Sequence, residues 1–301
     1  MKHAFVLSAA LLMTSIPVAC GQAAEPVEVP EAVIPAAGEA APEAEVDGGQ
    51  TANAEALQKD QQGIDVASLP RSIIVDDGAL KADIRFDEAV FSLGPAIAAD
   101  VVDDAQVRLK AMQEDAEAYK EADPDYFRPY DLKIDWRVSG AAGQLASLEG
   151  FVYTYTGGAH GNYMTDGRIY DAKTGDRMRI GELFMDKDAA AAALADTVYD
   201  AIAKAKTERN SSIGGYDMFL GESKDALSVS DILAGNVSLV ASTEKGKLGG
   251  FVLHYAPYEI GSYAEGAYHV TVPEADFRAF LKPEYRPLFA GTPAEIKRAG
   301  N

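Results

Sequence analysis

The distribution of hydrophobic and polar positions changes sharply at about residue 69. Residues 21–68 are rich in Ala, Pro, Glu and Gly and poor in aromatic and branched aliphatic residues. From Ser72 onward such residues recur with clear periodicity. A segment with little apolar surface to bury cannot offset the entropy lost on ordering. We therefore predict a disordered acidic linker at 21–68, followed by a folded part.

The first half of the folded part predicts strands on either side of a long helix. Leu80–Phe86 alternates apolar and polar residues, and Asp77-Gly78 predicts a hairpin turn that joins it to Ile73–Val75. Apolar residues at spacings of three and four predict a helix from about Pro95 to Ala122. The strict alternation of Tyr130–Val138 predicts a half-buried strand.

The second half shows the same mixture of strands and helices. Two strands are predicted at Leu145–Thr156 and Arg168–Tyr170, and an Ala-rich helix at Lys187–Arg209. The remaining predicted elements are strands at Val237–Ala241, Gly250–Ala256 and Ala267–Val272 and a last helix that opens at Pro273. Because the spacing is not that of regular βαβ units, we predict an α+β fold with antiparallel sheets packed against long helices, in two subdomains.

The N-terminus has the pattern of an export signal. Lys2 precedes an apolar run from Ala4 to Val18, and Ala19 precedes Cys20, the only cysteine. This run is shorter than the roughly 20 residues that span a bilayer. The arrangement is similar to a bacterial lipobox, so we predict a signal peptide at 1–20 and lipidation of Cys20. The alternative is an ordinary cut nearby, for instance after Ala24, which discards Cys20.

The charge of the chain limits its partners. The 47 acidic and 27 basic residues give a net charge of −20. Such a chain does not favour nucleic acid or an anionic membrane surface, and it attracts basic partners, although solubility alone also explains the charge. We expect an exported protein that contacts the membrane only through its N-terminal lipid. Its place is the periplasmic face of the outer membrane in a Gram-negative host, and otherwise the outer face of the cell membrane.

Two loops contain the candidate binding residues. Gly157, Gly158 and His160 lie in a Gly-Gly-Ala-His-Gly segment after a strand, which predicts either a tight turn or a ligand-binding loop. The second segment, from Pro257 to Gly266, contains Tyr258, Glu259 and Tyr263. Tyrosines of this kind either form a recognition surface or plug the end of a sheet.

The sequence offers no convincing catalytic set. His160, His254 and His269 lack the spacing and the carboxylate of a typical metal site, so neither a metal nor another cofactor is predicted. Glu259 and Glu265 are the carboxylates of an alternative hypothesis, a glycan hydrolase. We expect a protein that is not an enzyme.

Three segments resemble a known bacterial domain type. They are Tyr155–Asn162, Tyr170–Gly175 with Leu183-Phe184, and Tyr255–Gly266. Together they resemble the C-terminal domain of the anti-sigma factor RsiV, which also occurs in bacterial lipoproteins. Residues 72–138 resemble the smaller companion domain found there and in front of the catalytic domain of the peptidoglycan deacetylase PdaC.

The resemblance implies a companion domain at 69–140, an RsiV-like domain at 141–290 and a tail at 291–301. RsiV-like domains bind lysozyme, whereas the sigma-binding segment of RsiV and the deacetylase domain of PdaC have no counterpart in this sequence. The resemblance therefore implies a non-catalytic recognition protein of the cell envelope. Its expected partner is lysozyme, another basic envelope protein or a peptidoglycan-related ligand. An envelope assembly or structural lipoprotein is the remaining alternative.

Overall fold

The computed structural model describes residues 63–295, all within one compact unit. The predicted signal peptide, Cys20 and most of the predicted linker lie outside the described residues. No helix of residues 63–295 is long and apolar enough to cross a membrane.

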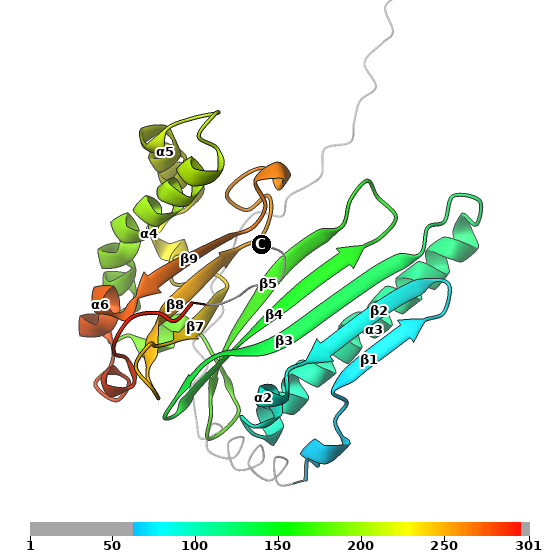
Figure 1. Cartoon of the computed structure of the whole chain (residues 1–301), viewed down its shortest axis with the longest axis horizontal. Coiled ribbons are helices and arrows are strands. Elements are labelled where there is room, and N and C mark those ends of the chain that lie inside the picture. Colours follow the sequence, from blue (N-terminus) through cyan, green and yellow to red (C-terminus); the bar gives the residue numbers. More distant parts are fainter. Residues whose placement is uncertain (1–62, 296–301) are drawn as a thin grey trace, which may run out of the picture. The chain divides into compact units, whose positions relative to one another are not determined.

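A six-stranded sheet forms the first half of the described chain (Figure 1). Its strands lie side by side in chain order: β1 (Ser72–Asp76), β2 (Leu80–Phe86), β3 (Tyr130–Ala142), β4 (Leu145–Tyr155), β5 (Asn162–Asp171) and β6 (Arg177–Met178). The short helix α2 (Glu88–Phe91) and the long helix α3 (Pro95–Ala122) connect β2 to β3. The α+β class and the predicted helix bounds are confirmed.

The pairing of β2 with β3 departs from the predicted antiparallel sheets, because these two strands are parallel. Parallel neighbours need a crossover connection, and α3 supplies it by carrying the chain back along the sheet. All other neighbouring strands in the sheet are antiparallel.

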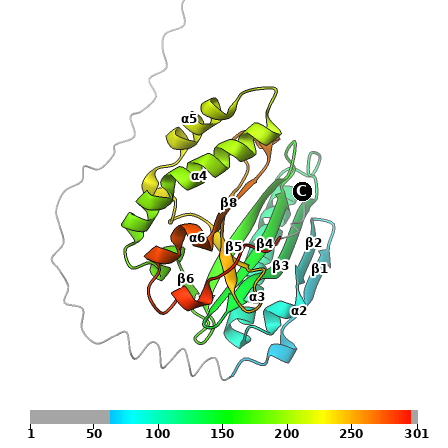
Figure 2. The same cartoon turned by 60° about the vertical axis from the view of Figure 1, so that its left-hand side comes forward.

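A second, three-stranded antiparallel sheet packs on the first. It consists of β7 (Val237–Ala241), β8 (Leu248–Tyr255) and β9 (Tyr268–Pro273). Figure 2 shows it between the six-stranded sheet and the helices α4 (Lys187–Arg209), α5 (Tyr216–Ala226) and α6 (Glu274–Phe277). Helices α2 and α5 were not predicted from the sequence. Short 3-10 turns complete the chain at Val66–Ser68, Ile180–Leu183, Val229–Asp231, Tyr263–Glu265, Arg278–Phe280 and Arg286–Leu288.

Strand β7 crosses three strands of the first sheet at close range. A Cβ atom on Gly167 of β5 would lie 2.6 Å from the backbone of Val237, and one on Gly140 of β3 would lie 2.9 Å from that of Ala241. Between these points the Leu239 amide donates to Ser147 Oγ of β4 at 2.8 Å. Glycines at the two crossings therefore permit the close approach of the sheets.

The predicted segment boundaries differ from the structure in three places. The boundary at residue 140 falls inside β3, so segments 69–140 and 141–290 share one sheet. The ordered chain begins before the predicted residue 69, because Val66 and Leu69 pack on the hydrophobic core beneath α3. In the predicted tail, the Ala294 amide donates to the Ala241 carbonyl, so residues 291–294 continue the fold.

Candidate functional site

Two loops about 100 residues apart in the sequence meet at one end of the sheets. One is the β4–β5 loop, residues 156–161, and the other is the β8–β9 loop, residues 256–267. The imidazole of His160 stacks on the Tyr263 ring, with centroids 3.8 Å apart and planes 23° apart. The Tyr263 hydroxyl donates to the Gly161 carbonyl at 2.6 Å. The structure therefore brings His160 and Tyr263, predicted on separate loops, into one cluster.

Tyr258 occupies an unusual backbone conformation. The Glu259 amide donates to the Ala256 carbonyl at 3.1 Å and closes a turn in which Pro257 precedes Tyr258. Tyr258 has a φ of +77°, where glycine or asparagine is usual in a turn of type II. Its side chain is 64% exposed, and its ring centroid lies 5.6 Å from that of Tyr263. Strained residues of this kind concentrate at functional sites.

The two glutamates of the β8–β9 loop hold its backbone in place. Glu259 Oε2 accepts a hydrogen bond from the Ala256 amide at 2.7 Å. Glu265 Oε1 accepts one from the Ser262 amide, and its Oε2 accepts one from the Tyr268 hydroxyl, both at 2.7 Å. Burial opposes ionisation of Glu265, yet these hydrogen bonds prevail and hold its pKa below the usual value. Both carboxylates therefore act as caps within their own loop.

An aromatic cluster extends from the loops onto the strands. We define it as Phe151, His160, Tyr163, Tyr258 and Tyr263. Partial burial, together with nearby Tyr163, raises the pKa of Tyr263, so its phenol remains a hydrogen-bond donor at neutral pH. Tyr163 was not predicted as a site residue: aromatic residues alternate along β4, but β5 shows no such pattern that would have singled it out.

The two candidate glycines shape the β4–β5 loop. Gly157 has a φ of +87°, and a Cβ atom there would lie 3.7 Å from Tyr119 of α3. Gly158 has open space around it, with only the His160 carbonyl at 4.0 Å. These glycines therefore set the course of the loop, and His160 provides its side-chain contact with the cluster.

A hollow lies beside the aromatic cluster, along β5. It has a volume of about 300 Å³, and Arg108, Val152, Thr154, Asn162, Tyr163, Met164, Ala256 and Pro257 line it. A second hollow of about 460 Å³ shares Arg108, Val152 and Thr154 with the first and continues along α3 to Met112 and Asp115. The adjoining hollows offer a mainly apolar surface next to the turn that carries the exposed Tyr258.

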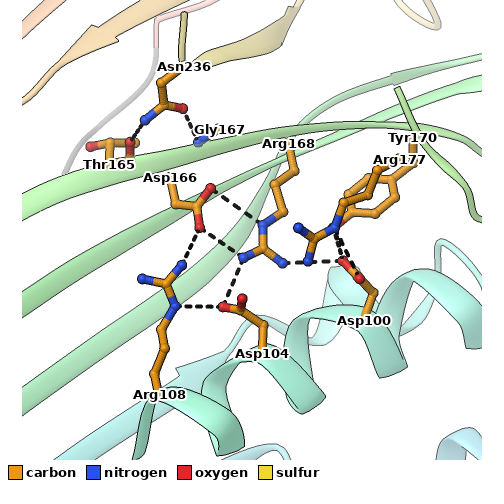
Figure 3. Close-up of polar contacts among 10 residues, drawn as sticks. All are labelled: Asp100, Asp104, Arg108, Thr165, Asp166, Gly167, Arg168, Tyr170, Arg177 and Asn236. Carbon is orange, nitrogen blue, oxygen red and sulfur yellow. Dashed lines mark hydrogen bonds and ion pairs between the residues drawn. The ribbon is translucent and has the colours of Figure 1, made fainter. Parts of the chain in front are cut away.

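A charged network joins β5 to α3 (Figure 3), and one of its members, Arg108, also lines the hollow. Arg168 is only 5% exposed, and its guanidinium contacts Asp100, Asp104 and Asp166 at 2.9–3.2 Å. It also lies 4.3 Å from the centroid of the Trp136 ring. Burial disfavours the charged form, but the hydrogen bonds and charge of Asp166 prevail and raise the pKa of Arg168.

Two further arginines complete this network. Arg108 bridges Asp104 at 2.7 Å and Asp166 at 3.0 Å, and Arg177 contacts Asp100 at 2.8 Å. On α3, Asp100, Asp104 and Arg108 follow one another at spacings of four, which places them on one helix face. That spacing was the signal in the sequence from which the network could have been predicted.

A second polar chain lies between the two sheets. Arg137 contacts Glu149 at 2.8 Å, and the Ser238 hydroxyl donates to Glu149 Oε1, also at 2.8 Å. Because the Ser238 hydroxyl donates its hydrogen to Glu149, Ser238 Oγ accepts a hydrogen bond from His254 Nε2 at 2.8 Å. His254 Nδ1 faces His269 Nδ1 at 2.9 Å. These groups connect β3 and β4 to the strands that flank the β8–β9 loop.

The three histidines therefore have different settings. His160 stacks on Tyr263, whereas His254 and His269 contact each other across β8 and β9. Within residues 63–295 no group of three or more His, Cys, Asp or Glu residues is arranged to hold a metal ion.

Comparison with known proteins identifies one segment of the chain. Residues 80–163 match the family model described as deacetylase PdaC; the match lies partly in the segment predicted to be a PdaC-type companion domain and runs past its predicted boundary at 140. No curated protein matches the sequence.

Two solved structures are similar to this chain. A DUF3298-family member from Bacteroides fragilis has 19% sequence identity and a TM-score of 0.49; the match covers 71% of this chain and 93% of that one. A DUF3298-family protein from Pseudomonas aeruginosa has 16% identity and a TM-score of 0.43; the match covers 75% of this chain and 98% of that one.

Proposed function

We propose that this chain is a recognition protein of the bacterial cell envelope that binds a basic polypeptide, such as lysozyme, through the aromatic cluster. The observation that supports it most is the stacking of His160 on Tyr263, which joins two loops beneath the exposed ring of Tyr258. A tyrosine offers contact area with few rotatable bonds and a polar tip, which suits recognition.

The strain at Tyr258 supports a binding role over a plug for the sheet. A plug would be buried, whereas this side chain is 64% exposed in a conformation that costs an L-residue about 1 kcal/mol. Glu259 caps the first residue of this turn, and Glu265 caps the backbone at Ser262 further along the loop. The protein therefore maintains an unfavourable turn that presents an aromatic ring to solvent.

The net charge of −20 favours a cationic partner at long range. In this proposal charge accelerates the encounter, and the aromatic cluster supplies the specific contact. The proposed place of action is the envelope, after export and lipidation at Cys20. Metabolic labelling with a radioactive fatty acid, retained in the wild type and lost in Cys20→Ser, tests that part separately.

Calorimetric titration tests the binding. Residues 21–301 are titrated with a panel of muramidases at low and at moderate salt. Saturable binding that persists at moderate salt and weakens at least tenfold in Tyr258→Ala is the expected result. Tyr126→Ala is the matched control, because Tyr126 is also exposed but lies in the turn between α3 and β3.

Binding that disappears with added salt, or that Tyr126→Ala weakens as much as Tyr258→Ala, contradicts the proposed site. In that event the acidic surface is a nonspecific attractor, and an endogenous envelope protein becomes the expected partner.

A further inference from the structure

Strand β5 has an open edge on the side away from β4. On that side β6 pairs only with Ile169 and Tyr170, and within residues 63–295 no strand pairs with Tyr163–Gly167. Burial follows the pairing: Arg168–Tyr170 is buried, whereas Tyr163–Gly167 is half-buried. Unpaired strand edges are the templates on which another chain can add as a strand.

The backbone groups that face this edge can be identified. The Gly167 amide donates to the side-chain oxygen of Asn236 at 2.7 Å, and the Asn236 amide nitrogen donates to the Thr165 carbonyl. In an antiparallel ladder alternate residues direct their N–H and C=O groups to the same side. The backbone N–H and C=O of Tyr163 therefore point away from β4, as those of Thr165 and Gly167 do. The backbone groups of Met164 and Asp166 point toward β4.

The Asn236 carboxamide thus occupies one repeat of the edge as the N–H and C=O of one residue in a neighbouring strand would (Figure 3). Beyond it, the N–H and C=O of Tyr163 and the N–H of Thr165 continue the same row. An incoming strand can exchange two hydrogen bonds with Tyr163 and accept a third from Thr165.

The hollow of about 300 Å³ lies along this stretch of β5. Asn162, Tyr163 and Met164 line it from the strand, and Ala256 and Pro257 line it from the β8–β9 loop. In strand addition, main-chain hydrogen bonds supply affinity and pockets for alternate side chains supply specificity. The open edge provides the main-chain hydrogen-bonding groups, and the neighbouring hollow provides a pocket for a side chain.

We propose that the Tyr163–Thr165 edge binds an extended, lysine- or arginine-rich segment of a partner polypeptide, which adds to the sheet as a strand. This inference rests on the proposed function and names the class of partner. The row of peptide groups selects a polypeptide over a glycan, because a glycan lacks matching N–H and C=O groups at strand spacing.

Charge selects the basic partner over two other occupants. A second copy of the chain would bring another net charge of −20 to the edge. The chain's own N-terminal segment is also acidic; its acidic residues are Glu25, Glu28, Glu31, Glu39, Glu43, Glu45 and Asp47. Both occupants are repelled by the charge that attracts a cationic strand.

A designed peptide tests the inference on residues 21–301. The probe is an eight-residue amidated peptide of alternating lysine and valine, and its matched analogue carries methyl groups on the four central peptide nitrogens. Calorimetry measures the affinity, and hydrogen exchange by NMR follows the amides of Tyr163 and Thr165. We expect the methylated peptide to bind at least tenfold more weakly, and the unmethylated one to slow exchange at both amides about tenfold or more.

A pair of protein variants tests the same edge from the other side. Thr165→Pro removes an N–H that faces away from β4, a position where an edge strand tolerates proline. Thr165→Ala loses the same hydroxyl but retains the N–H. We expect about a tenfold loss of peptide affinity in Thr165→Pro and none in Thr165→Ala. Should Thr165→Pro fail to fold, the methylated peptide decides the question alone.

Equal affinity for both peptides, or no protection of the two amides, overturns the inference. Protection that rises with protein concentration in the absence of peptide assigns the edge to a second copy. Protection that is lost when residues 21–62 are removed assigns the edge to the chain's own N-terminal segment. Either of these two results also overturns the inference. If muramidase binding depends on Tyr258 but leaves the edge amides unprotected, strand addition at the edge is wrong and the proposed function stands. If the peptide adds to the edge but no muramidase binds, strand addition at the edge is supported and lysozyme is excluded as the partner.

Discussion

The side-chain oxygen of Asn236 lies 2.7 Å from the backbone nitrogen of Gly167, and this contact marks the joint between the two sheets. Asn236 immediately precedes β7, whose first residue crosses β5 where Gly167 has no side chain. The joint thus depends on a missing Cβ atom and on one carboxamide. It also fixes the end of the β5 edge that we propose to be open for a partner.

Gly167→Ala is expected to be strongly destabilising. A Cβ atom there would lie 2.6 Å from the Val237 carbonyl carbon, a backbone atom that cannot rotate away. We expect the free energy of unfolding to fall by about 3 kcal/mol, as in severe overpacking. Urea denaturation measures it. The control is Gly158→Ala, which meets only the His160 carbonyl at 4.0 Å and should change the stability by less than about 0.5 kcal/mol. Similar losses in both variants would contradict the close crossing of the sheets.

Asn236→Ala is expected to loosen the same joint without a steric clash. It leaves the Gly167 amide and the Thr165 carbonyl without their side-chain partner, at a cost of about 1–3 kcal/mol. Exchange of the Gly167 amide should accelerate as well. Asn236→Asp is the comparison, because a carboxylate still accepts from Gly167 but cannot donate to Thr165. Unchanged Gly167 exchange in Asn236→Ala would show that the carboxamide does not hold the joint.

The elements of this fold could be predicted from the sequence to different degrees. The bounds of α3 and α4 follow from regular apolar spacing and the Asp123-Pro124 stop, so they could be predicted closely. The parallel pairing of β2 with β3 could not be predicted, because periodicity reports the buried face of a strand and not its neighbour.

The candidate site shows a similar limit. Loop composition selected His160, Tyr258 and Tyr263, but no pattern in the sequence indicates that His160 would stack on Tyr263. The positive φ of Tyr258 could not be predicted either, because the third position of a type II turn is usually glycine. Contacts between distant segments depend on the packing of both sheets.

A comparison of Tyr258→Gly with Tyr258→Ala should show how much the positive φ at this position reduces the stability of the protein. Glycine adopts a φ of +77° without the steric cost that any other residue meets there, so Tyr258→Gly should be about 1 kcal/mol more stable than Tyr258→Ala. Both variants lose the aromatic contact with Tyr263. Thermal or urea unfolding measures the difference. Equal stability of the two variants would mean that the turn relaxes and that Tyr258 is not held in a strained conformation.

Ser238→Ala should weaken the polar chain between the sheets. The hydroxyl links Glu149 to His254, and all three side chains are buried. Its removal costs both groups a hydrogen-bond partner, so we expect a loss of about 1–3 kcal/mol in urea unfolding. Ser139→Ala is a suitable control, because the Ser139 hydroxyl is buried without a hydrogen-bond partner among the described residues. A loss in Ser139→Ala equal to that in Ser238→Ala would argue against the linking role.

Removal of Arg168 should alter both stability and its dependence on pH. Burial opposes the ionisation of Asp104, but hydrogen bonds and charge from Arg108 and Arg168 lower its pKa below the usual value. A carboxylate with a lowered folded-state pKa stabilises the protein above its ordinary pKa of about 4, and this stabilisation is lost as the pH falls through the lowered value. Arg168→Ala removes a positive charge from among Asp100, Asp104 and Asp166, so these carboxylates repel one another more strongly. Lowering the pH reduces their negative charge and therefore this repulsion.

We therefore expect Arg168→Ala to lose about 3–5 kcal/mol at pH 7, as when one partner of a buried ion pair is removed, and less than this near pH 3. Urea unfolding at pH 7, 5 and 3 measures the change. The control is Arg85→Ala, because Arg85 pairs with Asp83 on the surface, where such pairs contribute at most about 1 kcal/mol. A loss in Arg168→Ala that stays constant from pH 7 to pH 3 would show that the contact with Trp136, and not the aspartate network, accounts for the role of this arginine.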